Sequence, residues 1–313
     1  MPRLTDNMRA AVYMMTSQAG FALNDAMMKL SSETLNLFQA ISLRGFIAGI
    51  LIAILAFWFG ALRHRIVRRD RIMLVLRSVG EAGAAFCFLG ALFNMPIANA
   101  TAILQSVPLA VALGAAIFLG ERIGWRRYLA ISIGFLGVII IVRPGSEGFN
   151  AYALLALAAV GFMVVRDLAT RRLTAEIPSL LVTLVSMIVI TATAGLFSLV
   201  EGWRPVGAAP AGYILLASLC LIVAVLFGVM TIRLGAIGFT QPFRYTLLPW
   251  AILFGILFFG EYPDMPMLVG STLILGTGLF TFYRERAGDR RQARLRSRGH
   301  HPLETAAPGG GRR

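Results

Sequence analysis

Five charged residues interrupt long apolar stretches of this sequence, and their types suit the binding of a polar solute. They are Asp25, Arg44, Arg77, Glu81 and Arg244. A charged side chain at the centre of a bilayer costs about 3 kcal/mol, so such residues are rare in membrane-spanning segments and usually functional. If all five are ionised, one positive charge is in excess, which would suit an anionic or strongly polar substrate. The alternative is that Arg77 or Arg244 extends toward the membrane surface, because each lies close to a cytoplasmic helix start.

Arg77 and Glu81 lie four residues apart and therefore on one face of the same predicted helix. Glu81 follows Arg71 by ten residues, which places it about 15 Å along a helix, near the middle of a bilayer. Two interpretations stay open: a carboxylate that binds substrate or carries a proton, or an ion pair that only holds this helix against a neighbour. For Asp25 and Arg44, on helices joined by a short loop, structural pairing is favoured and substrate binding is the alternative.

Glutamine precedes proline in two predicted helices. Gln105 lies three residues before Pro108, and Gln241 directly precedes Pro242. Proline has no N–H group and leaves the carbonyl four residues earlier without its partner. In lipid such groups must be satisfied by protein or by water in a cavity, so these helices are expected to border a translocation site, unless they only kink for packing. The remaining binding candidates are one amide and two aromatic side chains that could stack on a planar solute: Asn24, Tyr245 and Trp250.

The sequence offers little for catalysis or for metal binding. Its three histidines lie in predicted loops or in the tail, and it contains no Gly-x-Ser-x-Gly nucleophile motif. The phosphate-binding motif of ATP-driven pumps is also missing, since Lys29 is the only lysine and lacks the glycine-rich context. We therefore predict a transporter with no cofactor and no metal, and keep a membrane-embedded enzyme as the alternative from another class.

The elements that must position these residues are long apolar helices. Of 313 residues, 58% are hydrophobic and only 14% are charged, and the mean hydropathy is +0.76; soluble domains carry about 25% charged residues. A membrane-spanning helix needs about 20 mostly apolar residues, and the two shortest candidate runs are separated by the turn sequence Arg143-Pro144-Gly145. The ten runs are 9–28, 37–60, 72–93, 97–119, 128–142, 151–166, 179–200, 211–231, 237–260 and 267–283.

Arginine is concentrated in every second connection between these runs and in the tail. The alternate connections carry few positive charges, each with an acidic neighbour. Because cytoplasmic loops are enriched in Arg and Lys, this pattern places both termini in the cytoplasm. We therefore interpret the net charge of +14 as a topology signal and expect a lipid bilayer and a small-molecule substrate as partners, and no nucleic acid.

The chain divides near residue 148 into two halves of five helices. Helix 97–119 contains Pro108 and ends at Gly120-Glu121, and helix 237–260 contains Pro249 and ends at Gly260-Glu261. Five is an odd number, so the second half must cross the membrane in the opposite sense. Inverted repeats are typical of secondary transporters, whose substrate site lies near the midplane. We predict an all-α integral membrane fold of ten transmembrane helices. Its parts are two inverted repeats over 1–148 and 149–285 and a basic, disordered cytoplasmic tail over 286–313.

These paired features resemble the EamA-type members of the drug/metabolite transporter superfamily. The resemblance rests on the two proline and Gly-Glu pairs, on Arg44 and on Gly134 and Gly137. The second half of this sequence departs from the pattern, because Met187 occupies the position that roughly corresponds to Arg44. The resemblance implies ten helices, alternating access in the inner membrane, and a central cavity built largely from the first, third, fourth, sixth, eighth and ninth helices. We interpret Gly45 and Gly49, with Gly134 and Gly137, as small-residue patches for close helix contact.

Within this family, the run Asn24-Asp25 and the segment 77–105 are similar to bacterial riboflavin or S-adenosylmethionine carriers. The resemblance therefore implies a carrier of a small organic metabolite, with riboflavin uptake as the first expectation. Import or export of S-adenosylmethionine, an amino acid or an amine is the alternative, since substrate changes freely on one fold. Whether the carrier is a homodimer stays open.

Overall fold

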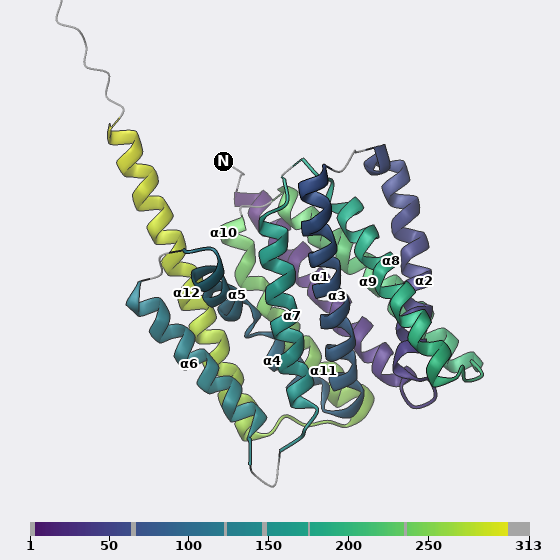
Figure 1. The fold of residues 1–313 in the computed structure, drawn as a ribbon. Helices are drawn as coiled ribbons and strands as arrows, with labels where there is room; N and C mark the ends of the chain where they lie inside the picture. The colour runs from purple at the N-terminus through teal and green to yellow at the C-terminus, as the bar shows by residue number, and fades with distance from the viewer. Residues whose placement is uncertain are drawn as a thin grey trace, which may run out of the picture.

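The computed structural model describes residues 4–63, 67–121, 124–145, 149–174, 176–234 and 237–299, which form helices and connecting segments and contain no strand (Figure 1). The predicted all-α class is confirmed for these residues. The elements are α1 (Leu4–Ser31), α2 (Leu37–Trp58), η1 (Ala61–Arg63), α3 (Arg68–Asn94), α4 (Ile97–Leu104), α5 (Val107–Phe118), α6 (Trp125–Val142), α7 (Ala153–Arg171), α8 (Ser179–Glu201), α9 (Ala208–Leu234), α10 (Ile237–Thr240), η2 (Gln241–Thr246), α11 (Leu247–Phe259) and α12 (Met265–Gly299).

Nine stretches of the described residues are long and apolar enough to cross a bilayer. Seven are single helices: α2, α3, α6, α7, α8, α9 and α12. The other two are composite, Ile97–Phe118 from α4 and α5, and Gln241–Phe259 from η2 and α11. α1 has 28 residues but is not among the nine, because residues such as Asn24, Asp25 and Lys29 lower its hydropathy. A tenth crossing by α1 therefore stays a prediction.

Four helix pairs form the bundle: α1 packs along α9, α3 along α7, α2 along α8 and α6 along α12. Figure 1 shows the α6–α12 pair at one side of the molecule and the α2–α8 pair at the other. Glycine allows the close approaches, since a Cβ on Gly137 would lie 2.6 Å from the carbonyl oxygen of Gly270. Gly45 packs in the same way against Thr191 of α8. The interpretation of Gly45 and Gly137 as packing positions is confirmed.

Large apolar side chains are exposed on the outside of the bundle. Among them are Phe57, Trp58, Ile117, Leu199 and Val200, each more than half exposed. Soluble monomers rarely expose apolar surface on this scale. The surface of the bundle is therefore suited to lipid.

Both helices in which glutamine precedes proline are broken, as predicted. Gln105 and Ser106 separate α4 from α5, and Pro108 cannot donate a hydrogen bond to the carbonyl of Leu104, four residues earlier. In the second half the 3-10 helix η2, which begins at Gln241, separates α10 from α11. Each half thus contains one helix that is interrupted within the apolar stretch.

Two predicted boundaries are wrong. α7 continues to Arg171, five residues beyond the predicted run, so Arg166 lies inside a helix and not in a loop. α12 continues to Gly299, whereas the sequence predicts a disordered tail from residue 286. The stretch 285–299 contains six arginines and two alanines, which are good helix formers whatever their charge. Residues 300–313 of the predicted tail lie outside the described residues.

Candidate functional site

Four charged residues of α3 and α7 are connected, and we call them the central network: Arg77, Glu81, Arg166 and Asp167. Glu81 lies between two arginines, with its Oε2 3.4 Å from Nη2 of Arg77 and its Oε1 3.4 Å from Nη1 of Arg166. Nε of Arg166 donates a hydrogen bond of 2.7 Å to Oδ1 of Asp167. The four side chains are between 16% and 31% exposed. The network is therefore partly buried.

The central network leaves polar atoms without full partners. Contacts of 3.4 Å are longer than the 2.7–2.9 Å typical of charge-assisted hydrogen bonds. Among the described residues, Oε2 of Glu81 and Nε of Arg77 have no hydrogen-bond partner. Arg77 also donates to the hydroxyl of Ser186 in α8, which lies 3.3 Å from the hydroxyl of Ser78. Buried polar groups are normally satisfied, so these atoms could accept or donate hydrogen bonds to a bound molecule.

Sequence reasoning identified Arg77 and Glu81 and missed Arg166 and Asp167. It ended the predicted run 151–166 at Arg166 and therefore counted this residue with the arginines of the connection that follows. One signal was available: no proline or glycine occurs between Arg166 and Pro178, so nothing ends the helix at Arg166. A helix that continues carries Arg166 along the face of α7 that packs on α3.

Arg244 extends this charged region from the second broken helix. Its side chain is exposed, although η2 packs against α1, α11 and α12. It interacts electrostatically with Asp167 and Arg166, and its guanidinium has no hydrogen bond or ion pair within the described part of the chain. Together with the central network it gives three arginines and two acids. If all five are ionised, this group carries one positive charge in excess, because Arg166 and Asp167 cancel each other.

The second group of charges, which we call the α1–α2 cluster, contains Asn24, Asp25 and Arg44. Nδ2 of Asn24 donates a 2.8 Å hydrogen bond to Oδ1 of Asp25, and Nη1 of Arg44 donates a 3.3 Å hydrogen bond to Oδ1 of Asn24. Arg44 and Asp25 also attract each other electrostatically. All three are at least 90% buried. The predicted pairing of Asp25 with Arg44 across the hairpin is thus made through the amide of Asn24.

The two helix breaks contact each other. Nε2 of Gln105 donates a 3.3 Å hydrogen bond to the carbonyl oxygen of Tyr245, so the structure brings the break of the first half against η2 of the second. Gln241, at the start of η2, is partly buried. The Tyr245 side chain turns toward α12, where its hydroxyl would lie 2.0 Å from a Cβ on Gly278. Tyr245 therefore joins the site through its backbone.

Trp250 lies apart from the charged residues. Its ring stacks on Phe254 at a centroid distance of 6.0 Å, and Phe254 in turn lies 5.8 Å from Phe258. These three rings follow one face of α11 at helical spacing. Trp250 is thus part of an aromatic row within one helix, and the structure does not bring it to the central network.

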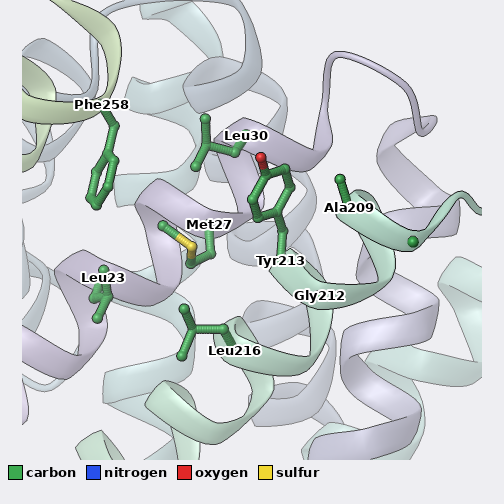
Figure 2. Close-up of a pocket in the computed structure, with 9 residues that line it drawn as sticks. Leu23, Met27, Leu30, Ala209, Gly212, Tyr213, Leu216 and Phe258 are labelled. Atoms are coloured by element: carbon green, nitrogen blue, oxygen red, sulfur yellow. The ribbon is translucent and has the colours of Figure 1, made fainter.

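An apolar groove of about 750 Å³ lies between α1, α9 and α11. Figure 2 shows side chains from these three helices facing the same space. Its lining contains a single polar side-chain group, the hydroxyl of Tyr213. The groove suits an acyl chain better than a polar metabolite, so the central network is the better candidate for a substrate site. The lining residues are Leu23, Met27, Leu30, Ala208, Ala209, Gly212, Tyr213, Leu216 and Phe258.

Residues 8–143 of this chain match the EamA-like transporter family. This chain is 31% identical over 233 residues to a riboflavin transporter of Rhizobium johnstonii, covering 74% of this chain and 76% of that protein. It is 25% identical to an S-adenosylmethionine uptake transporter of Rickettsia felis, covering 88% of this chain and 92% of that protein. It is 27% identical to the pseudopaline exporter CntI of Pseudomonas aeruginosa, covering 82% of this chain and 89% of that protein. One crystal structure shares the fold, with a TM-score of 0.59 at 20% identity over 88% of this chain and 98% of that one.

Proposed function

The chain belongs to the EamA-like transporter family of the drug/metabolite transporter superfamily, and from that premise we propose that it is a secondary carrier that takes up riboflavin by alternating access. It is a transporter and a multi-pass protein of the inner membrane, and the relatives are named as transporters and not as enzymes. The proposal of riboflavin depends on one observation, the 31% identity with a riboflavin transporter over three quarters of both chains.

The architecture that we propose for this carrier is ten crossings in two inverted repeats with cytoplasmic termini, α1 being the tenth. Reciprocal packing supports it. The first helix of each half packs on the third helix of the other, as α1 on α9 and α7 on α3. Helices at equivalent places, α2 with α8 and α6 with α12, pack on each other. A reporter fused after Gly207 should read as periplasmic and one at the C-terminus as cytoplasmic; the same side for both would remove the inverted repeat.

The central network has the chemistry to recognise the polar edge of a flavin. The imide edge of riboflavin presents a carbonyl, an N–H and a second carbonyl in a row. Glu81 supplies an acceptor between two donors, Arg77 and Arg166, which is the complementary order. Matching of this kind gives specificity because an unmatched polar group left in a buried site costs binding energy. The flat ring needs no charge partner, and riboflavin is neutral.

S-adenosylmethionine is the second candidate, because a relative named for its uptake matches 88% of this chain. Its sulfonium carries a permanent positive charge. In the central network with Arg244, three arginines face two acids, so the local field repels a solute with a net positive charge. The charge balance therefore favours a neutral solute such as riboflavin over this cation.

Uptake into proteoliposomes tests the proposal. We expect purified protein to accumulate radiolabelled riboflavin, unlabelled riboflavin to compete, and S-adenosylmethionine to compete at least about tenfold less well, a difference of about 1.4 kcal/mol. Uptake measured with and without a proton gradient shows whether protons drive it. Arg172→Gln is the matched control, because Arg172 is exposed at the end of α7 and outside the network. Correctly inserted protein that moves S-adenosylmethionine and not riboflavin would overturn the substrate assignment.

A further inference from the structure

The end of α11 is joined to the first half of the chain by an ion pair, which we call the outer pair: Lys29 and Glu261. The ammonium group of Lys29 binds the carboxylate of Glu261 directly and donates a 2.7 Å hydrogen bond to the carbonyl of Met95. It also lies 4.9 Å from the centre of the Phe259 ring. The second carboxylate oxygen of Glu261 accepts a 2.9 Å hydrogen bond from the backbone N–H of Ile97, the first residue of α4. The outer pair thus connects α1, α4 and α11.

The end of α5 carries a corresponding ion pair, the inner pair: Glu121 and Arg171. Nη1 of Arg171, in the last turn of α7, lies 3.1 Å from Oε1 of Glu121. Both side chains are exposed, by 46% and 44%, whereas those of Lys29 and Glu261 are exposed by only 11% and 21%. Figure 1 shows α5 and α7 ending at one edge of the bundle and α11 ending at the opposite edge. The two pairs therefore lie on opposite faces of the molecule.

The two pairs are related by the proposed repeat. Glu121 and Glu261 are 140 residues apart, and Lys29 and Arg171 are 142 apart. Each glutamate follows a glycine with a positive φ, 69° at Gly120 and 63° at Gly260. Each also donates its backbone N–H to the carbonyl six residues earlier, which satisfies a carbonyl at the helix end. Glycine is needed there because other residues rarely adopt this backbone conformation.

Both pairs cross between the halves of the chain. Glu121 and Lys29 belong to the first half, and their partners belong to the second. In each case the glutamate ends a broken helix and the cation ends the first helix of the other half. A rigid-body movement of one half against the other must therefore change both contacts, and it opens one face while closing the other.

We propose that the outer pair and the inner pair are the two gates of the transport cycle, each broken when its own face opens. This inference rests on the proposed carrier function and does not depend on the substrate. The outer pair is partly buried and connects three helices, whereas the inner pair is a single exposed contact. The structure is therefore a state with a firmly closed outer face, in which the inner face is the easier one to open.

The only lysine of the chain makes this testable without an added reporter. A membrane-impermeant N-hydroxysulfosuccinimide ester, applied from the outside to proteoliposomes, can modify only Lys29 and the α-amino group, which peptide mass spectrometry separates. The rate of Lys29 modification measures how often the outer face opens. Glu121→Gln and Arg171→Gln break the inner pair far from Lys29, favour the inward-open state, and should lower this rate about two- to fivefold, as expected for an exposed ion pair.

Arg172→Gln is the matched control and should leave the rate unchanged, because Arg172 adjoins Arg171 and is also exposed but lies outside the pair. Glu261→Gln should raise the rate, and because glutamine keeps an oxygen for the N–H of Ile97, folding is preserved. If Lys29 modification is the same in wild type, Glu121→Gln and Arg171→Gln, the gates are disproved whatever the substrate. If these variants lower it while riboflavin is not transported, the gates stand and the substrate assignment fails.

Discussion

The central network and the α1–α2 cluster both place arginine and carboxylate groups inside the bundle, yet they differ in how far these groups are exposed. In the α1–α2 cluster, Asn24 links Arg44 to Asp25 by two hydrogen bonds, and exposure is 9% or less. In the central network the contacts of Glu81 are 3.4 Å long and its side chain is 27% exposed. The first arrangement is closed and has one arginine for one acid. The second is open and has a nearby excess arginine.

This difference teaches that an intramembrane charge is not by itself a sign of substrate binding. A charge that is buried with its partner mainly fixes the packing of its helices, because removing one partner leaves the other uncompensated. A charge that is only partly buried loses less when it exchanges its partner for a solute. We therefore place substrate recognition in the central network and helix positioning in the α1–α2 cluster.

The largest expected effect comes from Glu81→Gln. The substitution keeps the shape of the side chain but removes the acceptor charge between Arg77 and Arg166. Hydrogen bonds to a charged group typically contribute about 1.5–3 kcal/mol, so uptake should fall about ten- to a hundredfold, at about 1.4 kcal/mol per factor of ten. Uptake and the melting temperature in detergent are measured on the same preparations.

The double variant Arg77→Gln/Glu81→Gln separates recognition from packing. It leaves Arg166 with its partner Asp167 at 2.7 Å, so no charge of the central network is left without a partner and the melting temperature should recover. If Glu81 recognises substrate, uptake stays low in the recovered protein. Full uptake by the double variant would make Glu81 a packing residue and would erase the contrast between the two regions.

Asp25→Asn should have the opposite profile, with a large effect on stability. It leaves Arg44 buried without a carboxylate, and we expect the free energy of unfolding to fall by about 3 kcal/mol. The double variant Asp25→Asn/Arg44→Met replaces the charges by groups of similar volume and should restore both the melting temperature and uptake. A stable Asp25→Asn/Arg44→Met protein without uptake would move this cluster into the substrate site.

The fold was largely predictable because its signals are local in sequence. Long apolar runs set the helices, and proline beside Gln105 and Gln241 marked the two breaks. The errors are also physical. From sequence alone, an arginine at a predicted helix end, such as Arg166, cannot be distinguished from a loop arginine. Its role becomes evident only when its partner on another helix is known. The helical extension of α12 was missed because high charge was taken for disorder, although the residues themselves favour helix.

Individual residues of the site could be predicted from the sequence, but the contacts between them mostly could not. Arg77 and Glu81 share a helix, so their four-residue spacing was enough. The contact of Glu81 with Arg166 joins positions 85 residues apart, and the link through Asn24 depends on how two helices pack. Trp250 was selected for its type alone, and the structure places it on Phe254. Contacts between distant segments follow from tertiary packing, which residue types and local spacing do not specify.

The smallest expected effect, and the one that sharpens the edge of the central network, concerns Arg244. Its side chain is exposed and has no hydrogen bond or ion pair among the described residues, so Arg244→Met should leave the melting temperature unchanged. If its guanidinium donates to the solute, losing one such hydrogen bond costs about 1.5 kcal/mol and the KM for uptake rises about tenfold. Arg244→Lys keeps the charge and should recover part of the affinity, whereas Arg233→Met, at an exposed arginine in the last turn of α9, should change neither quantity. An unchanged KM in Arg244→Met would confine recognition to α3 and α7. A lower melting temperature with normal uptake would instead make Arg244 a packing residue. Its role would then be helix positioning, as in the α1–α2 cluster, although its side chain is exposed.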